Sequence, residues 1–167
     1  LRTGNCLQVL QQDNFIYSIA FSPSGHLLAS GGADKLIWLW DAVTGELQNK
    51  LEGHDLRVNA VAYCREDLIV SGGDDGLLVF WSPLSARVIK QLSGHNGPIR
   101  AIDYNYESEI IASCSDDKTV RVWNLQGECI AVILNEFNIR SCVILQGGKA
   151  IAFSDTVGLI KIWDITT

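Results

Sequence analysis

Four tryptophans recur along the chain at nearly constant spacing, and this spacing constrains the fold more than any other feature. Trp40, Trp81, Trp123 and Trp163 are separated by 41, 42 and 40 residues. A period near forty indicates one supersecondary unit copied several times, with each copy burying its apolar faces against its neighbours. The sequence therefore predicts a repeat protein, and a surface for partners rather than a catalyst.

Glycine turns keep the same period as the tryptophans. Gly4, Gly45 and Gly127 occupy matching slots, Ala86 fills the slot between the last two, and successive slots are 41 residues apart. Four periods therefore fill the chain almost from end to end. Residues 1–4 do not resemble a signal peptide. We expect that the sequence begins within the repeat pattern, as a fragment or at a designed domain boundary would.

Each period contains four short apolar runs separated by turn residues, which is typical of strands. In the second period the runs are residues 57–63, 68–71, 77–81 and 87–92. The glycine- and aspartate-rich segment 72–76 supplies the positive-φ and Asx-turn positions of a tight hairpin. No segment shows helical periodicity. Four antiparallel strands per unit, repeated radially, form the blade of a β-propeller.

The phrases around each tryptophan resemble those of the WD-repeat β-propeller family along the whole chain. The second period carries His54, Ser71, Asp75 and Trp81 in the family's order, and the third period repeats the set. One such phrase is a weak signal, whereas four in register are specific. The resemblance implies an all-β propeller of four-stranded antiparallel WD-repeat blades, with four blades in this chain. The implied blades are residues 12–51, 53–92, 94–134 and 135–167, the last completed by a strand at residues 5–11.

The resemblance also implies that the repeated polar residues form a hydrogen-bonded network inside the blades. The set contains the residue types of a Ser-His-Asp hydrolase triad, but it recurs from period to period, whereas an active site is needed once. We therefore expect a structural role, because buried imidazole, carboxylate and indole groups must satisfy one another. The expected network residues are Ser30, Asp34, Trp40, His54, Ser71, Asp75, Trp81, His95, Ser113, Asp117, Trp123 and Trp163.

Two periods depart from this set. Gln12 replaces the histidine in the first period, and Asn135, Phe153 and Val157 replace histidine, serine and aspartate in the fourth. We expect the fourth blade to depend on apolar packing and to be the least rigid, since terminal repeats are often atypical. The candidate packing residues are Ile133, Val143, Ile151, Ile160 and Ile162.

The way in which the blades close is left open by the sequence. Residues 5–10 match residues 128–133, the outermost strand of the third period, and the last period lacks such a strand. In the WD-repeat family the N-terminal strand commonly completes the final blade, and closure removes costly sheet edges. Three arrangements remain: half of a larger ring, two chains paired in an eight-bladed ring, and a closed four-bladed monomer.

The family commonly binds partners on a narrow face, the rim, built from the start of each innermost strand and the position beside each turn aspartate. Arginine and aromatic residues are favoured at binding hot spots, and Arg100 and Arg140 could hold a carboxylate or phosphate bidentately. The alternative is that these are solvated loop residues balanced by Asp74 and Asp116. The expected rim residues are Phe15, Tyr17, Arg57, Asn59, Asp74, Pro98, Arg100, Asp116, Asn138 and Arg140, with Ala33 and Thr156 beside the other two turns.

Charge and cysteine usage limit the classes of partner and compartment. The net charge of −6 argues against nucleic acid and anionic membranes as partners, and no apolar run approaches the ~18 residues of a membrane helix. Five cysteines without a CxxC pair indicate reduced, buried thiols and a cytoplasmic location. No metal-ligand spacing or phosphate-binding glycine loop stands out, so we expect no metal and no cofactor.

These observations favour a non-catalytic scaffold or recognition module within a larger signalling or regulatory protein. Its partner would be a protein or peptide, and an acidic or phosphorylated segment would suit the arginines of the rim. The alternatives are a hydrolase built on the propeller scaffold and a reader of histone tails or other basic peptides.

Overall fold

The structure is a computed structural model that describes residues 4–145 and 147–166, and all regular secondary structure in these residues is β. Residues 1–3, read above as part of a cut in the pattern, lie outside the described residues. The strands are β1 (Ile16–Phe21), β2 (Leu27–Gly32), β3 (Ile37–Asp41), β4 (Leu47–Leu51), β5 (Val58–Arg65), β6 (Leu68–Gly73), β7 (Leu78–Ser82), β8 (Arg87–Leu92), β9 (Ile99–Asn105), β10 (Ile110–Ser115), β11 (Thr119–Asn124), β12 (Cys129–Leu134), β13 (Ile139–Ile144), β14 (Ala150–Asp155) and β15 (Ile160–Asp164).

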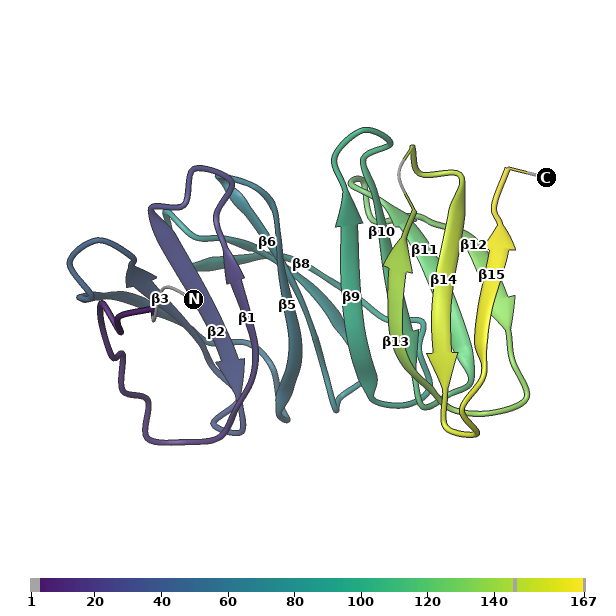
Figure 1. Ribbon diagram of the computed structural model, residues 1–167, viewed down its shortest axis with the longest axis horizontal. Coiled ribbons are helices and arrows are strands. Elements are labelled where there is room, and N and C mark those ends of the chain that lie inside the picture. Colours follow the sequence, from purple (N-terminus) through teal and green to yellow (C-terminus); the bar gives the residue numbers. More distant parts are fainter. Residues whose placement is uncertain (1–3, 146, 167) are drawn as a thin grey trace.

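Consecutive strands pair antiparallel into four sheets, which are the blades of a propeller (Figure 1). The first three blades, β1–β4, β5–β8 and β9–β12, have four strands each, and the fourth blade, β13–β15, has three. The predicted all-β fold and its four blades are confirmed. Residues 4–12 belong to no strand, so the expected strand at residues 5–11 does not complete the fourth blade within this chain.

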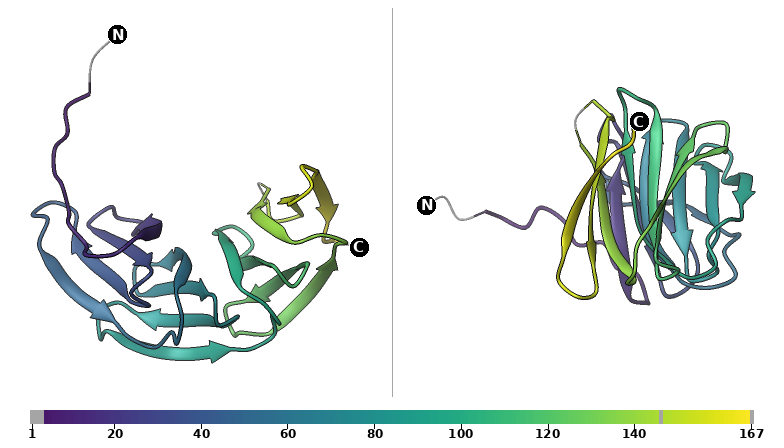
Figure 2. Two further views of the ribbon diagram at one scale, coloured as in Figure 1. Left: turned by 90° about the horizontal axis from the view of Figure 1, so that it is seen from below. Right: turned by 90° about the vertical axis from the view of Figure 1, so that its right-hand side faces the viewer.

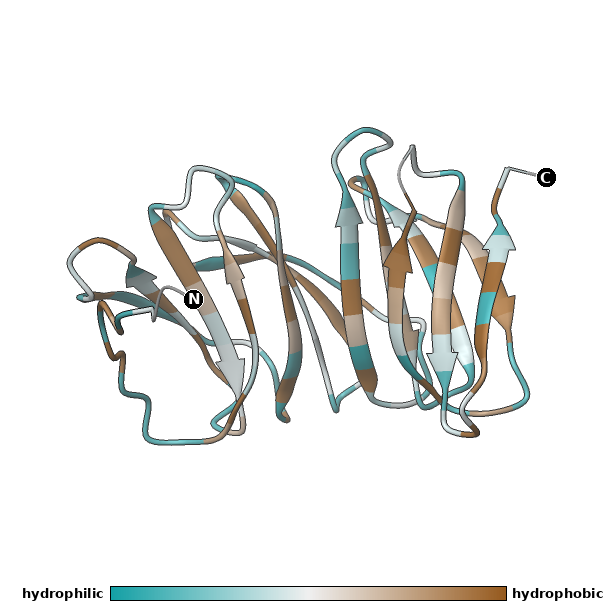
Figure 3. Cartoon of the chain, viewed as in Figure 1, coloured by the Kyte–Doolittle hydropathy of each residue, from teal (hydrophilic) through white to brown (hydrophobic). Residues whose placement is uncertain are grey.

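The blades follow one another along an open arc, with the first and last blades at opposite ends (Figure 2). This arrangement explains why the N-terminal segment does not reach the fourth blade: the gap of the arc lies between them. Hydrophobic bands run across the strands of every blade, whereas many of the turns contain hydrophilic segments (Figure 3).

Strand alternation gives each blade two apolar faces, and neighbouring blades cover them. On β7, Val79 and Trp81 pack in the cluster shared with the first blade, whereas Leu78 and Phe80 pack in the cluster shared with the third blade. All four side chains are buried. Successive side chains point to opposite faces of a strand, so an uninterrupted apolar run is what a strand covered on both sides requires.

Glycine in the phrase that ends β6 permits close packing between blades. A Cβ atom built on Gly72 would lie 2.4 Å from Cγ2 of Ile99, at the start of the next blade's inner strand. Gly31 meets Cγ1 of Val58 in the same way, at 2.6 Å. The repeated glycine therefore serves the contact between blades as well as the hairpin that follows it.

The two ends of the arc leave apolar side chains uncovered. Ile19 and Phe21 of β1 are exposed, although the equivalent positions in later blades are covered by the preceding blade. At the other end, Ile160 and Ile162 of the edge strand β15 are 78% and 68% exposed, so the expectation that they pack the fourth blade is wrong. They are exposed because β15 is the edge strand of its sheet and no other part of the described chain covers it.

The repeated polar residues of the second and third blades form the same buried hydrogen-bonded set. In the second blade, His54 lies 2.8 Å from Asp75 through Nδ1 and 2.7 Å from the Ser71 hydroxyl through Nε2. Trp81 donates its indole N–H to the same hydroxyl at 2.7 Å. The third blade repeats this geometry with His95, Ser113, Asp117 and Trp123.

The first blade builds the set around an amide instead of an imidazole. The Ser30 hydroxyl donates to Gln12 at 2.8 Å, and Gln12 donates to Asp34 at 3.3 Å. Trp40 donates to Ser30 at 3.0 Å, as the tryptophans of the next two blades do to their serines. A glutamine side chain has both a donor and an acceptor, so it can replace a neutral histidine between serine and aspartate.

The fourth blade contains a cluster of hydrogen-bonded polar residues that the repeat pattern did not predict. Asn135 donates to the buried carboxylate of Asp155 at 3.3 Å, and Lys161 contacts both residues. Trp163 is 44% exposed and lies outside this group. Asp155 aligns with a glycine or serine of the other blades rather than with their aspartates, so the repeat pattern gave no signal for it.

Burial and hydrogen bonding act in opposite directions on the ionisable groups of the network. Burial by itself raises the pKa of Asp75, but hydrogen bonds from His54 and from the amides of Leu77 and Asp55 outweigh it, so the pKa is lowered. Burial lowers the pKa of His95, despite the opposing contact with Asp117. At neutral pH the third blade therefore contains a neutral imidazole.

Replacing His95 with glutamine, the residue that the first blade uses, is expected to keep the fold and change its response to acid. His95→Ala should cost about 1–3 kcal/mol, because the buried Ser113 hydroxyl and Asp117 lose a partner, and His95→Gln should cost less. The folded-state pKa of His95 lies below its unfolded value, so its contribution to stability is complete above about pH 6.5 and decreases below it.

Urea unfolding midpoints of the wild type and both variants at about pH 5.5 and about pH 7.5 measure these effects. His95→Gln should lose less stability than the wild type on acidification. An equal loss in both proteins would show that His95 does not carry this part of the pH dependence.

Candidate functional site

The expected rim residues lie on one face of the arc, where the same backbone hydrogen bond recurs in every blade. The amide beside the turn after each second strand donates to the carbonyl of a residue just before the inner strand. Inner strands β9 and β13 begin at the lower edge in Figure 1, where this face lies. The four pairs, at 2.9–3.0 Å, are Ala33 with Phe15, Asp74 with Arg57, Asp116 with Pro98, and Thr156 with Asn138.

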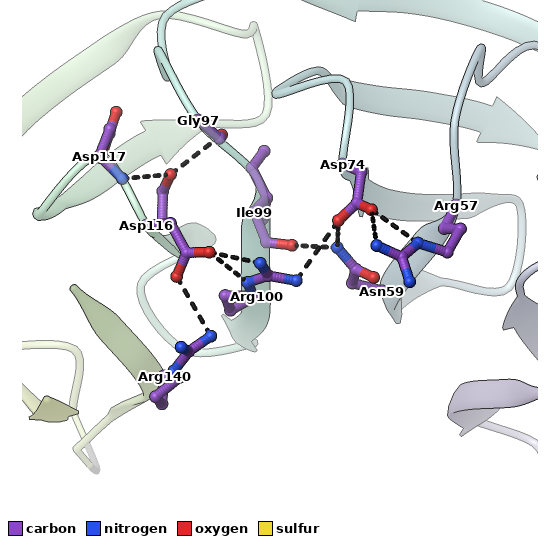
Figure 4. Close-up of polar contacts among 10 residues, drawn as sticks. Arg57, Asn59, Asp74, Gly97, Ile99, Arg100, Asp116, Asp117 and Arg140 are labelled. Carbon is purple, nitrogen blue, oxygen red and sulfur yellow. Dashed lines mark hydrogen bonds and ion pairs between the residues drawn. The ribbon is translucent and has the colours of Figure 1, made fainter. Parts of the chain in front are cut away.

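Three arginines and two aspartates of this face form a continuous chain of ion pairs, which we call the rim chain (Figure 4). Arg57 donates through Nε to Asp74 at 2.7 Å. Arg100 contacts Asp74 at 3.3 Å and donates through Nε to Asp116 at 2.9 Å. Arg140 reaches the other carboxylate oxygen of Asp116 at 3.2 Å. Three guanidinium groups and two carboxylates leave the rim chain with one positive charge.

The rim chain connects three blades. Arg100, on β9 of the third blade, contacts an aspartate of the second blade, and Arg140, on β13 of the fourth blade, contacts an aspartate of the third. Asn59 of the second blade donates to Asp74 at 2.8 Å and to the backbone carbonyl of Ile99 in the third blade at 2.9 Å. The central members of the rim chain therefore hold blades together as well as facing solvent.

Exposure differs between the centre and the ends of the rim chain. The side chains of Asp74, Asp116 and Arg100 are 11%, 16% and 26% exposed, whereas those of Arg57 and Arg140 are 53% and 52% exposed. The contact of Arg140 with Asp116 lacks hydrogen-bond geometry. The two terminal guanidinium groups consequently retain donors for an external ligand.

Aromatic residues extend the rim beyond Arg57. The guanidinium carbon of Arg57 lies 6.0 Å from the ring centre of Tyr17, which places the two side chains at the limit of a cation–π contact. Tyr17 and Phe15 are exposed, on the first blade. The sequence placed these residues together with Arg57 on one surface, and the structure does the same.

The contacts within the rim chain shift the pKa values of Asp74 and Arg100 in the directions that favour their charged forms. Burial raises the pKa of Asp74 by itself, but hydrogen bonds from Asn59 and Arg57 outweigh it and lower the pKa. The hydrogen bond to Asp116 raises the pKa of Arg100. Asp74 and Arg100 are therefore both charged at neutral pH. Ala33 and Thr156 supply no carboxylate beside the first and fourth turns, so the rim chain ends at Arg57 and Arg140.

The residue types of a hydrolase triad meet in the second and third blades, but their hydroxyl groups are inaccessible. Ser71 and Ser113 are fully buried, and each hydroxyl already accepts a tryptophan indole N–H. A nucleophile must reach its substrate, so this geometry stabilises the blades and does not form an active site. Among the described residues, no group of three histidine, cysteine or acidic side chains is placed to hold a metal ion.

The cysteines correct one expectation. Cys64, Cys114 and Cys142 are buried, whereas Cys6 and Cys129 are exposed, and all five are free thiols. Cys129 is exposed because it lies on the outer strand β12, which faces solvent, and Cys6 lies in the N-terminal segment that pairs with no sheet. Within the part of the chain that the structure describes, no helix is long and apolar enough to cross a membrane.

Comparisons with known proteins agree with this architecture. Protein tipD of Dictyostelium discoideum is 29% identical over 151 residues, which cover 89% of this chain and 25% of that protein. Nuclear distribution protein PAC1 of Coccidioides posadasii is 29% identical over 98% of this chain and 31% of its own length. Pre-mRNA-splicing factor cwf17 of Schizosaccharomyces pombe is 33% identical over 87% of this chain and 44% of its own length. The chain spans less than half of each of these relatives.

A family model for the WD domain, G-beta repeat, matches residues 4–41, 45–82 and 86–124. These segments contain the first three blade tryptophans and most of the polar network, and the fourth, atypical period lies outside them. The repeat phrases, the antiparallel blades and this match agree: the chain belongs to the WD-repeat (WD40) family.

Proposed function

We propose that this chain is a non-catalytic recognition module whose rim binds an acidic or phosphorylated segment of a partner protein. WD-repeat proteins generally act as scaffolds for protein interactions. The observation that carries the proposal is the pair of half-exposed guanidinium groups, Arg57 and Arg140, at the ends of a rim chain with one excess positive charge. Carboxylates and phosphates accept bidentate hydrogen bonds from arginine.

The two aspartates of the rim chain favour acidic ligands over basic ones. Asp74 and Asp116 are held by arginines and are mostly buried, so they orient the guanidinium groups and offer little surface to a basic ligand. A basic peptide at the rim would have to displace these contacts. An acidic ligand adds to them without breaking the central pairs, because Arg57 and Arg140 have free donors.

Two of the relatives agree with a non-catalytic role. They are named as a nuclear distribution protein and a pre-mRNA-splicing factor, and neither of these two names gives a catalytic activity. We place the chain in the cytoplasm, because five cysteines cannot all pair within one chain and a reducing compartment keeps thiols free.

Removing the terminal arginines should abolish recognition of acidic ligands and leave the fold intact. A peptide library with phosphorylated, acidic and basic arms of equal length identifies ligands for the wild type, and fluorescence anisotropy measures their affinity. The variant with Arg57→Ala and Arg140→Ala should bind acidic or phosphorylated ligands at least about tenfold more weakly. Its urea midpoint should fall only slightly, because ion pairs of half-exposed side chains contribute about 0–1 kcal/mol each.

Arg87→Ala is the matched control, since it removes an exposed arginine from the outer strand β8. It should bind as the wild type does. Failure of the acidic and phosphorylated arms to bind, or full affinity in the double variant, would contradict the proposed role of the rim.

We also propose that the exposed end faces bind further blades, and that a second copy of the chain can provide them in an eight-bladed ring. Light scattering after size exclusion should then give a mass near twice 18.3 kDa. Ile19→Asp, at an exposed position of β1, should keep the chain monomeric because it buries a charge in the joined face. A wild-type monomer at every concentration contradicts this assembly.

A further inference from the structure

A groove separates the first and second blades on the face opposite the rim. It is formed where the turn after β5 and the turn after β7 of the second blade lie beside β2, β3 and β4 of the first. Its volume is about 480 Å³, within the usual range of ligand sites. The lining residues are Leu27, Leu39, Asp41, Gln48, Asn49, Glu66, Asp67, Pro83 and Leu84.

The floor of the groove is apolar and continues into the core between the blades. Leu39 is buried in the cluster shared by the two blades, and Leu27 packs against the same cluster. Leu84, at the tip of the turn after β7, is 91% exposed although it lines the groove. Covering such a side chain is favourable, because apolar surface removed from water contributes free energy in proportion to its area.

The edge of the groove is acidic. Asp41, Glu66 and Asp67 are three of its lining residues, and no lysine or arginine within residues 4–145 and 147–166 lines it. Backbone amides of Thr44 and Val43 lower the pKa of Asp41, which is therefore ionised at neutral pH. Arg65, next to Glu66 in sequence, forms an ion pair with Glu109 at 2.5 Å and so belongs to the adjoining contact with the third blade.

A buried hydroxyl lies close to this acidic edge. Tyr63 is 4% exposed, and its hydroxyl has no hydrogen-bond partner among the described residues. It belongs to the same apolar cluster as Leu39. Burial, and then the charge of Glu66, raise the pKa of Tyr63.

We propose that this groove binds a short protein segment in which a lysine or arginine is adjacent to a large apolar side chain. The apolar side chain covers Leu39 and Leu84, and the cationic head contacts Asp41, Glu66 or Asp67. Lysine and arginine suit such a site because their aliphatic stems pack on apolar surface while the charge stays at the edge.

Charge complementarity selects this occupant. A nucleic acid or an acidic peptide would bring its negative charge against three carboxylates. An uncharged apolar segment would leave the acidic edge without a counter-charge. The volume accommodates a few side chains rather than a folded domain, so the ligand is a peptide segment, and the site is distinct from the rim and its acidic ligands.

A nuclear magnetic resonance titration with three synthetic peptides tests the proposal. The probe peptide is Gly-Ser-Lys-Leu-Lys-Ser-Gly. One control replaces leucine with serine, and the other replaces both lysines with glutamate. The probe should shift the amides of Glu66, Asp67 and Leu84 at concentrations up to about 1 mM, and both controls should bind at least about tenfold more weakly.

Variants then assign the two halves of the groove. Asp67→Lys and Leu84→Ser, both at exposed turn positions, should each weaken binding of the probe about tenfold or more. Glu107→Lys is the matched control: it makes the same kind of charge change in the corresponding turn of the third blade, away from the groove. It should bind the probe as the wild type does.

Three results would overturn the proposal: no shift at the groove, equal binding of the leucine-free control, or shifts confined to the rim. Double replacement of Arg57 and Arg140 with alanine should leave the probe's affinity unchanged. The proposal for the rim and the proposal for the groove can therefore be contradicted separately, because they are tested with ligands of opposite charge and with separate variants.

Discussion

Each blade of this protein has two apolar faces, and only a neighbouring blade can cover them. Strand β7 shows the requirement most clearly: Val79 and Trp81 pack towards one neighbour, and Leu78 and Phe80 towards the other. The periodic tryptophans, the small residue at Gly72 and the buried polar network all serve this stacking. The exposed apolar side chains at both ends of the arc follow from the same constraint, because the first and fourth blades each have one uncovered face.

Much of the fold and of the rim could be predicted because the chain repeats itself. Equivalent positions of the repeat occupy equivalent places in space, so Arg100 and Arg140, at one position, and Arg57, two residues before that position in its own period, could be assigned to one face from the repeat alone. The serine hydroxyls of the network could be separated from a catalytic triad by the same reasoning, and their complete burial agrees with it.

Features that break the repeat could not be predicted in this way. Asp155 and Lys161 stabilise the fourth blade from positions that carry other residues elsewhere. The pairing of Arg100 with aspartates of two different blades depends on side-chain reach across an interface, which spacing along the chain does not give. The groove opposite the rim arises where two turns of the second blade lie beside strands of the first. Each of these features depends on contacts between residues far apart in the sequence, and the local repeat pattern does not specify such contacts.

Hydrogen exchange read by mass spectrometry tests the central claim, that neighbouring blades supply most of the stability of each blade. At a concentration where the chain is monomeric, amides of β6 and β10 should exchange most slowly, and those of β1, β14 and β15 should exchange fastest, because each end blade has one open face. Protection of the end blades should increase as copies associate. Equal protection of all four blades in the monomer would contradict the account, since stability would then reside within single blades.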